Sequence, residues 1–279
     1  MNKKLNVVVL YSSGHLGSII TLNRILKMKC YKVVGIVRAE NLQFSDKGLK
    51  KLSKQIRKTG ILFAFMLFWQ RLMQALAYVL TYIIPGLSRR IKTSTEISQE
   101  RNIPLFTTKN INDPETLEFM KVLNPDISIS AYFPMILKKA ALSIPKMGTL
   151  NIHPGWLPEY KGAMVYFWAL KNNEPTAGVS VHWMDEGIDT GPLLGRKAFR
   201  LKKKHTQEKV LILTAICGSR ILNQIGKKLQ KGKTIKPINT EKEKSHYYSM
   251  PNANAYEEYC KHHKFFDIAT IFSIIIRKE

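Results

Sequence analysis

Two polar segments of this chain could carry chemistry. The first, Asn151-Ile152-His153, ends a β-type run, and the second is a glycine-flanked turn that contains Asp189. Alternate residues of a strand share a face, so Asn151 and His153 would lie side by side. An amide and an imidazole placed in this way can donate hydrogen bonds to a developing oxyanion, and the imidazole can also shuttle a proton. If the turn folds back onto the strand, the Asp189 carboxylate would favour the charged form of His153.

Alternating elements must position these residues. We expect strands at 7–10, 32–37, 103–107, 126–131, 149–153 and 178–184, and helices at 19–28, 114–122 and 163–170. The strand, glycine loop, helix and second strand at the N-terminus are the opening βαβ unit of a doubly wound sheet. The predicted fold is therefore α/β: a doubly wound, mostly parallel, Rossmann-like sheet. By themselves, Asn, His and Asp at strand ends also serve as caps and turn residues.

A basic and apolar helical insert, residues 47–95, interrupts this pattern. Its first part would form a basic helical face, made of Lys47, Lys50, Lys51, Lys54, Arg57 and Lys58. The segment 61–84 that follows is very apolar, with Gln70, Gln74 and Thr81 on one side. It is long enough to cross a bilayer. A crossing would place Arg71 near the membrane centre and would divide the sheet between two compartments, so we do not expect one.

Two interpretations of the insert stay open. Residues 47–92 would dock on an anionic membrane surface through an apolar face with cationic flanks. Alternatively, the helix packs on the domain or on a second subunit, since hydrophobic periodicity does not separate the two. The domain prediction is a catalytic domain over 1–200 that carries this insert, followed by a basic C-terminal extension over 201–279. Within the extension, 265–276 is expected to form a capping helix or strand.

The whole chain is basic. Its 279 residues include 44 Lys+Arg and 20 Asp+Glu, a formal net charge of +24, while 45% of residues are hydrophobic. This composition supplies a packed core and excludes a disordered or low-complexity protein. The charge favours polyanionic partners, namely a phosphorylated substrate, RNA or an anionic membrane. Three dispersed cysteines indicate a reducing cytoplasm, and the N-terminal apolar run is expected to be the first strand rather than a signal peptide.

Two separated motifs connect the chain to a known family. Leu150-Asn151-Ile152-His153-Pro154 with Leu157-Pro158, and Gly178–His182 continuing to Gly187-Ile188-Asp189-Thr190-Gly191, resemble the formyltransferases that use 10-formyltetrahydrofolate. That family includes glycinamide ribonucleotide, methionyl-tRNA and amino-sugar formyltransferases. The resemblance implies a catalytic trio of Asn151, His153 and Asp189, which transfers a formyl group from the folate to an amine. It implies no metal.

The resemblance also assigns binding residues. Met135, Ile136 and Leu137 would flank the folate co-substrate, and Trp183, Met184, Asp185 and Gly187 would form the opposite wall of its pocket. Ser13, Gly14, Gly17 and Ser18 would lie where glycinamide ribonucleotide enzymes hold the substrate phosphate, at a helix start that suits an anion.

The acceptor is expected to be a small phosphorylated amine of the glycinamide ribonucleotide type. An amino-sugar nucleotide, a membrane-associated glycan precursor or methionyl-tRNA are the alternatives within the family. A basic RNA- or membrane-binding protein on the same scaffold is the non-enzymatic alternative, although retention of the whole trio argues against it. Nucleic acid is not the expected partner. The expected location is the cytoplasm, with peripheral association at the inner face of a membrane as a hypothesis.

Overall fold

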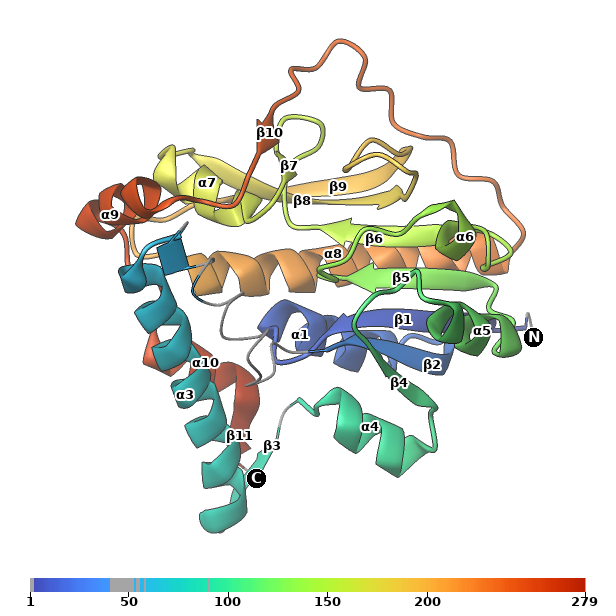
Figure 1. Ribbon diagram of the computed structural model, residues 1–279, viewed down its shortest axis with the longest axis horizontal. Coiled ribbons are helices and arrows are strands. Elements are labelled where there is room, and N and C mark those ends of the chain that lie inside the picture. The colour runs from blue at the N-terminus through green and yellow to red at the C-terminus, as the bar shows by residue number, and fades with distance from the viewer. Residues whose placement is uncertain (1–2, 41–52, 54–55, 58, 90, 279) are drawn as a thin grey trace.

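A seven-stranded sheet forms the centre of the molecule (Figure 1). The computed structural model describes residues 3–40, 53, 56–57, 59–89 and 91–278. The strand order is β4-β2-β1-β5-β6-β8-β9, with β8 antiparallel to β6, β9 antiparallel to β8 and the other neighbours parallel. The strands are β1 (Leu5–Ser12), β2 (Tyr31–Ala39), β4 (Leu105–Thr108), β5 (Ile127–Ala131), β6 (Thr149–His153), β8 (Thr176–Trp183) and β9 (Leu193–Arg200). The expected α/β fold class and its strands are confirmed, and β9 is an additional strand.

Helices cover both faces of this sheet. On one face lie α1 (Leu16–Ile25) and α8 (Gln207–Gln230); on the other lie α5 (Pro114–Val122) and α6 (Lys139–Leu142). Central strand β1 serves both cores, because Val7 and Val9 are buried on the first face and Val8 and Leu10 on the second. Two shorter helices, α4 (Ser94–Arg101) and α7 (Val165–Lys171), complete the periphery. Helix α1 begins three residues before its expected start, and this changes the position of the glycine loop.

Helix α8 corrects the predicted C-terminal extension. We expected a basic appendage from residue 201, but α8 packs along α1, β6 and β8 and buries a full apolar face. The packing is close: a Cβ on Gly218 would collide with Cγ2 of Ile152 in β6. Within this amphipathic helix Lys227 and Lys228 lie on the exposed side, whereas Lys202, Lys203 and Lys204 precede it. Residues 207–230 are therefore a layer of the sheet domain, and a boundary at residue 200 does not describe it.

The apolar insert forms one long helix, α3 (Ile61–Ile83), which packs on C-terminal elements. It contacts α9 (Ala253–His262) and α10 (Ile268–Ile275), and β3 (Leu87–Arg89) after it pairs antiparallel with β11 (Ile276–Lys278). The helical form of 268–275 agrees with the expected capping element. By length and composition α3 could cross a membrane, with 17% of its most apolar window buried. However, β2 before it and β4 after it are neighbours in one sheet, which a single crossing would separate.

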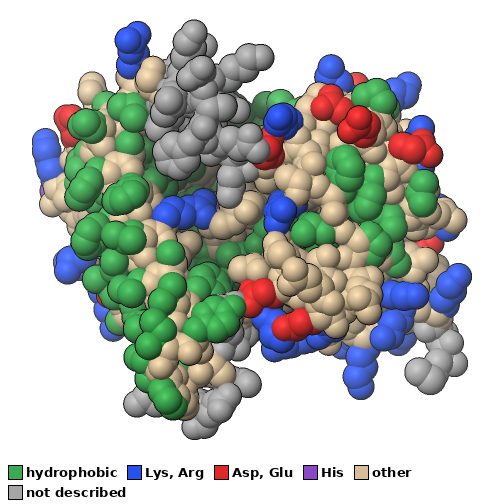
Figure 2. Space-filling view, turned by 60° about the horizontal axis from the view of Figure 1, so that its bottom comes forward, with side chains coloured by type: hydrophobic (Ala, Val, Ile, Leu, Met, Phe, Trp, Pro, Cys, Tyr) green, Lys and Arg blue, Asp and Glu red, His purple; other side chains and the backbone are tan. Residues whose placement is uncertain are grey.

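Helix α3 turns its polar stripe inward. Gln70 and Gln74 donate hydrogen bonds to Glu208 of α8, whereas the outward face is apolar. The exposed residues of that face, from Phe65 to Ile83, are Phe65, Phe68, Trp69, Leu72, Leu76, Val79, Tyr82 and Ile83. Figure 2 shows hydrophobic side chains gathered along the side of the molecule where α3 lies. Apart from Arg57, the lysine-rich face expected over 47–58 lies outside the described residues.

Candidate active site

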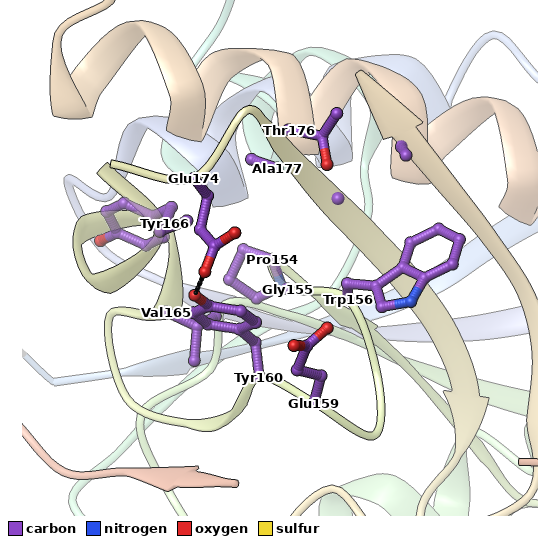
Figure 3. Close-up of a pocket in the computed structure, with 13 residues that line it drawn as sticks. Pro154, Gly155, Trp156, Glu159, Tyr160, Val165, Tyr166, Glu174, Thr176 and Ala177 are labelled. Carbon is purple, nitrogen blue, oxygen red and sulfur yellow. Dashed lines mark hydrogen bonds between the residues drawn. The ribbon is translucent and has the colours of Figure 1, made fainter. Parts of the chain in front are cut away.

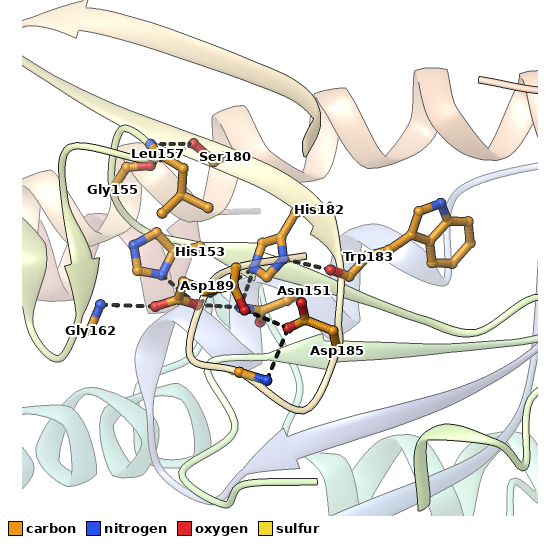
Figure 4. Close-up of polar contacts among 12 residues, drawn as sticks. Asn151, His153, Gly155, Leu157, Gly162, Ser180, His182, Trp183, Asp185 and Asp189 are labelled. Atoms are coloured by element: carbon orange, nitrogen blue, oxygen red, sulfur yellow. Dashed lines mark hydrogen bonds and ion pairs between the residues drawn. The ribbon is translucent and has the colours of Figure 1, made fainter. Parts of the chain in front are cut away.

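The three residues of the expected catalytic trio come together at the end of β6. Asn151 and His153 are on the same side of this strand, opposite His182 and Ser180 of the antiparallel strand β8. Asp189 lies in the connection between β8 and β9 with φ of 54°, a left-handed conformation that aspartate tolerates better than most residues. This turn folds the carboxylate back over the strand end. The three side chains therefore lie close together in the fold, as predicted (Figure 4).

Asp189 is the centre of the cluster. Its Oδ1 atom lies 3.3 Å from Nδ1 of His153, 3.5 Å from Nε2 of His182 and 3.5 Å from Nδ2 of Asn151. Its Oδ2 atom accepts a hydrogen bond of 2.9 Å from the backbone N–H of Gly162. Burial alone would raise the pKa of Asp189. The His153 charge, the hydrogen bond from His153 and the Gly162 N–H outweigh burial and hold that pKa well below its usual range.

His153 lies beneath the site rather than in its opening. Its side chain is 3% exposed, with Nδ1 facing Asp189 and Nε2 donating to the backbone carbonyl of Tyr160. A carbonyl and a carboxylate only accept hydrogen bonds, so an imidazolium provides a donor for each. We expected His153 and Asn151 to face an oxyanion together, but only Asn151 and Asp189 line the adjacent pocket. His153 contributes charge from behind Asp189.

His182 is a site residue that the sequence analysis left out of the predicted set. Its Nδ1–H donates to the Trp183 carbonyl at 2.7 Å, which leaves Nε2 of the neutral ring free to accept from Nδ2 of Asn151 at 3.2 Å. The interaction orients the Asn151 amide. The 3.5 Å contact from the same nitrogen to Asp189 is long, so one amide hydrogen remains available toward the pocket. The signal was present in the sequence, because Ser180 and His182 alternate along β8 as Asn151 and His153 do along β6.

A pocket next to Asn151 contains most of the expected folate-binding residues. Its apolar wall includes Phe133, Met135, Ile136, Met184 and Ile188. Its polar lining consists of Ser130, Asn151, His182, Asp185 and Asp189. Leu137 and Gly187 complete the lining. Six of the seven residues predicted for this role are therefore grouped around one pocket.

Trp183 is the exception and corrects the prediction. Alternation along β8 points its side chain away from the pocket that His182 and Met184 line (Figure 4). The indole packs instead against the backbone at Gly148 and joins the core under α8. Only the Trp183 carbonyl takes part in the site, as the acceptor for His182.

The glycine loop also differs from its prediction. Because α1 begins at Leu16, Gly17 and Ser18 belong to its first turn and are buried. Ser18 donates to the Ala131 carbonyl and accepts from the Ser12 N–H, so its hydroxyl is used inside the fold. Gly14 lines a different, open pocket beside α3, whereas Ser13 is not part of that lining. Of the four expected phosphate-binding residues, Gly14 lines this pocket and the other three do not.

A further pocket lies behind the loop that follows His153 (Figure 3). Trp156, Glu159 and Tyr160 line it, together with Glu174, whose carboxylate accepts a 2.7 Å hydrogen bond from the Tyr160 hydroxyl. None of Asn151, His153 and Asp189 is in its lining. The Tyr160–Glu174 bond stabilises the loop whose backbone carbonyl holds His153, so this pocket supports the site from behind.

The fold and the cluster of Asn151, His153 and Asp189 form a candidate enzyme site, and comparison with known proteins identifies the family of the chain. Residues 85–225, half of the chain, match the formyl transferase family model. The chain therefore belongs to the formyl transferase family, which confirms the family expected from the two motifs. Within the described residues, no group of three His, Cys, Asp or Glu side chains could hold a metal ion.

Relatives of different specificity are similar to the chain. It is 34% identical over 148 residues to the bifunctional polymyxin resistance protein ArnA of Wigglesworthia glossinidia brevipalpis, covering 52% of this chain and 23% of that protein. It is 31% identical over 151 residues to methionyl-tRNA formyltransferase of Clostridioides difficile strain 630, covering 54% and 49%. The chain thus spans half or less of these relatives' length.

Solved structures share the fold at low sequence identity. A phosphoribosylglycinamide formyltransferase from Bacillus halodurans aligns with TM-score 0.56 and 17% identity, covering 82% of this chain and 97% of that one. The sugar 3N-formyl transferase WlaRD, solved with dTDP and 5-N-formyl-THF, aligns with TM-score 0.53 and 17% identity, covering 89% and 70%. These similarities establish the architecture and leave the acceptor open.

Proposed function

We propose that this protein is a 10-formyltetrahydrofolate-dependent N-formyltransferase that acts on the primary amine of a small phosphorylated acceptor. The single observation that carries the proposal is the cluster of Asn151, His153 and Asp189 at the base of a half-apolar pocket. The family membership supplies the reaction class, and the pocket beside the cluster supplies room for a donor. Three free cysteines are consistent with the cytoplasm as its location.

The pocket fits a flat, partly polar donor such as the pterin of the folate. Met135, Ile136 and Met184 would pack on its faces, while the Asp185 carboxylate and the backbone around Gly187 would bind its hydrogen-bonding edge. When bound, 10-formyltetrahydrofolate supplies an activated formyl group. The pocket combines an apolar wall with hydrogen-bond acceptors at one end, and such a lining suits a heteroaromatic ring.

The residues then divide the catalytic work. Asn151, oriented by His182, donates its free amide hydrogen to the formyl oxygen as negative charge develops there. His153 donates from Nδ1 toward Asp189, so it holds the carboxylate ionised and in place behind the reacting centre. The Asp189 carboxylate lines the pocket, where it orients the attacking amine and takes part in moving its proton to the departing nitrogen.

The acceptor class can be tested directly. The purified chain would be incubated with 10-formyltetrahydrofolate and one amine at a time: glycinamide ribonucleotide, 3-amino- and 4-amino-sugar nucleotides, or charged initiator tRNA. Tetrahydrofolate release that depends on glycinamide ribonucleotide would support the proposal, and dependence on an amino-sugar nucleotide would support the alternative. Release without any amine would indicate a hydrolase. Absence of release together with absence of folinic acid binding would reject a folate-dependent enzyme.

We also propose that the outward face of α3 docks on an anionic bilayer. Its exposed aromatic and aliphatic side chains include Trp69 and Tyr82, residue types that suit the membrane interface. Charge supports this choice of partner. A surface hollow lined by Lys202, Lys203, Lys204, Lys209 and Lys264 also contains Asp267 and Thr270, at the beginning of α10, the helix that packs on α3. The apolar face of α3 would contact the acyl chains of the bilayer, and the lysine-rich hollow near α10 would contact its acidic headgroups.

A further inference from the structure

A long strap of chain lies against the loop that follows strand β6. The strap, residues 231–252, runs from the end of α8 to the beginning of α9 (Figure 1). It lies beyond the family-matched residues 85–225, so no family motif describes it. Its strand β10 (Tyr247–Tyr248) pairs parallel with β7 (Lys161–Gly162), which belongs to the loop between β6 and α7. The strap therefore contacts the loop that leads out of the candidate active site.

The backbone N–H groups of β7 alternate between the strap and Asp189. Those of the residues before and after Gly162 donate to strap carbonyls, at 3.0 Å to His246 and at 2.8 Å to Tyr248. The N–H of Gly162 itself points to the opposite edge of the strand and donates to Oδ2 of Asp189 at 2.9 Å. A two-residue strand is marginal without a partner. The strap thus fixes the direction of the N–H that Asp189 accepts.

The strap approaches Gly162 closely. This glycine has φ of 100°, and a Cβ on it would collide with the carbonyl oxygen of Tyr248. Next to this contact, the Tyr248 ring stacks on Tyr160 with centroids 4.8 Å apart and planes inclined by 8°. The Tyr160 carbonyl is the acceptor for Nε2 of His153. The strap therefore packs against both backbone groups through which this loop contacts His153 and Asp189.

An ion pair anchors the strap upstream of β10. Glu243 accepts two hydrogen bonds of 2.7 Å from Arg196 of β9, a bidentate geometry that fixes both side chains. The same guanidinium donates to the Leu157 carbonyl at 2.8 Å and lies 4.1 Å from the centroid of the Trp156 ring. The Arg196 side chain is 16% exposed. Arg196 thus connects the strap, the loop between β6 and α7, and the sheet at one point.

We infer that the strap positions Asp189 for catalysis, with the Arg196–Glu243 ion pair as its anchor. It acts through β10 and the Gly162 N–H. Arg196 and Glu243 are positioning residues, because neither lines the pocket beside Asn151. The inference rests on the proposed function for the reaction in which the placement of Asp189 matters. A partly exposed ion pair contributes little to global stability, whereas a small displacement of a reacting group lowers the rate strongly.

Amide exchange tests the strap without catalysis. Hydrogen exchange and the Gly162 amide proton resonance would be measured by NMR in the full chain and in Glu243→Ala. The inference predicts exchange about 10-fold or more faster at residues 160–163, with α8 unchanged. The Gly162 proton should also move upfield, because a hydrogen bond to a carboxylate deshields it. Glu243→Asp should retain part of the protection, and Glu241→Ala, at an exposed glutamate of the strap, is the matched control.

Kinetics test the positioning role. Glu243→Ala should lower kcat by about 10-fold, while KM for the amine, folinic acid binding and the urea midpoint stay at their wild-type values. Tyr248→Leu removes the stack on Tyr160 and leaves the ion pair intact. It is the second variant and should show the same pattern. A loss of kcat caused by a destabilised fold would lower the urea midpoint as well.

The outcomes separate the strap from the proposed function. Wild-type exchange at residues 160–163 in both Glu243→Ala and Tyr248→Leu would overturn the inference, and so would an equal acceleration throughout α8. If the wild-type chain formylates an amine and the variants exchange faster with an unchanged kcat, the function stands and the positioning role fails. If exchange accelerates only at residues 160–163 and the Gly162 resonance moves, but no amine is formylated, the hold on Asp189 stands and the function fails.

Discussion

The Nδ1 atom of His153 lies 3.3 Å from the Oδ1 atom of Asp189, on the side of the carboxylate away from solvent. Asp189 thus separates a buried histidine from the pocket and receives the Gly162 N–H on its other oxygen. The relationship gives the two residues different tasks. In the proposed mechanism Asp189 contacts the reactants, and His153 sets the charge state and the orientation of Asp189 from beneath.

This division predicts unequal effects of mutation. Asn151→Ala removes the amide donor that faces the formyl oxygen and should lower kcat by about 10²- to 10³-fold with folinic acid binding unchanged. His153→Ala leaves a buried carboxylate without its counter-charge and should lower kcat to a similar extent. Tetrahydrofolate release measures both effects. Asn254→Ala, an exposed asparagine in α9, is the matched control. Full activity in either site variant would overturn the mechanism.

His182→Gln tests the residue that sequence analysis left out. Gln cannot reproduce both the donor to the Trp183 carbonyl and the acceptor for Asn151 at the same geometry, so the Asn151 amide should lose its orientation. We expect kcat to fall by about 10-fold or more while KM for the amine changes little. An unchanged kcat would show that Asn151 is oriented without His182.

Glu208 makes the stability of the fold depend on pH. Burial raises the pKa of this carboxyl from 4.5 to about 7, against the opposing effect of the Gln70 and Gln74 hydrogen bonds. A raised folded-state pKa gives stability that is complete below pH 4.5 and is lost as pH rises through 7. The loss is on the order of 3 kcal/mol. Urea unfolding at pH 5 and pH 8 should show it in the wild-type chain.

The matched variants for this prediction are Glu208→Gln and Glu257→Gln. A neutral glutamine at 208 removes the titration, so the difference in unfolding free energy between pH 5 and pH 8 should shrink by about the same 3 kcal/mol. Glu257 is exposed on α9, and its replacement controls for the loss of one negative charge. The assignment fails if both variants retain the wild-type pH dependence.

Vesicle binding tests the outward face of α3. Co-sedimentation with phosphatidylglycerol-rich vesicles should fall strongly in the double variant Phe68→Gln, Trp69→Gln, which removes two exposed interfacial side chains. Val122→Gln replaces an apolar residue of comparable exposure on α5 and is the control. Binding should weaken with salt, because acidic headgroups contribute through the lysine-rich hollow. Equal binding of both variants and the wild type would exclude α3 as the docking surface.

The close contact of α8 with the sheet predicts an overpacking effect. Gly218→Val places a branched side chain where even a Cβ would collide with Ile152, and it should destabilise the fold by about 1–3 kcal/mol in urea unfolding. Valine has a higher helix propensity than glycine, so a loss cannot be attributed to propensity. Gln224→Val, at an exposed position of the same helix, controls for β-branching. A Gly218→Val chain as stable as the wild type would contradict the packing.

Local sequence determined the strands and the order of the elements, and the resemblance of two motifs to a family supplied the candidate trio. Runs such as Val7–Leu10 and the alternation of Asn151 and His153 are short-range signals, because a strand's residues alternate between faces whatever surrounds it. The same logic could have found His182, whose spacing from Ser180 repeats that pattern. Trp183 was misassigned because it was treated as a member of a motif rather than as a residue on the opposite face of β8.

Only the tertiary structure decided which faces of the helices and strands pack against each other. The lysines of residues 201–279 suggested an appendage, and α8 was not recognised as part of the sheet domain. The apolar side of an amphipathic helix becomes part of a core only when it packs on a sheet. The sequence left open whether α3 docks on a membrane or packs on the domain, and only the fold shows that Gln70 and Gln74 donate inward to Glu208. Arg71 reaches Gly14 across segments distant in sequence, and no local pattern encodes such a contact. Periodicity specifies the faces of an element, and packing free energy, summed over the whole chain, selects their partners.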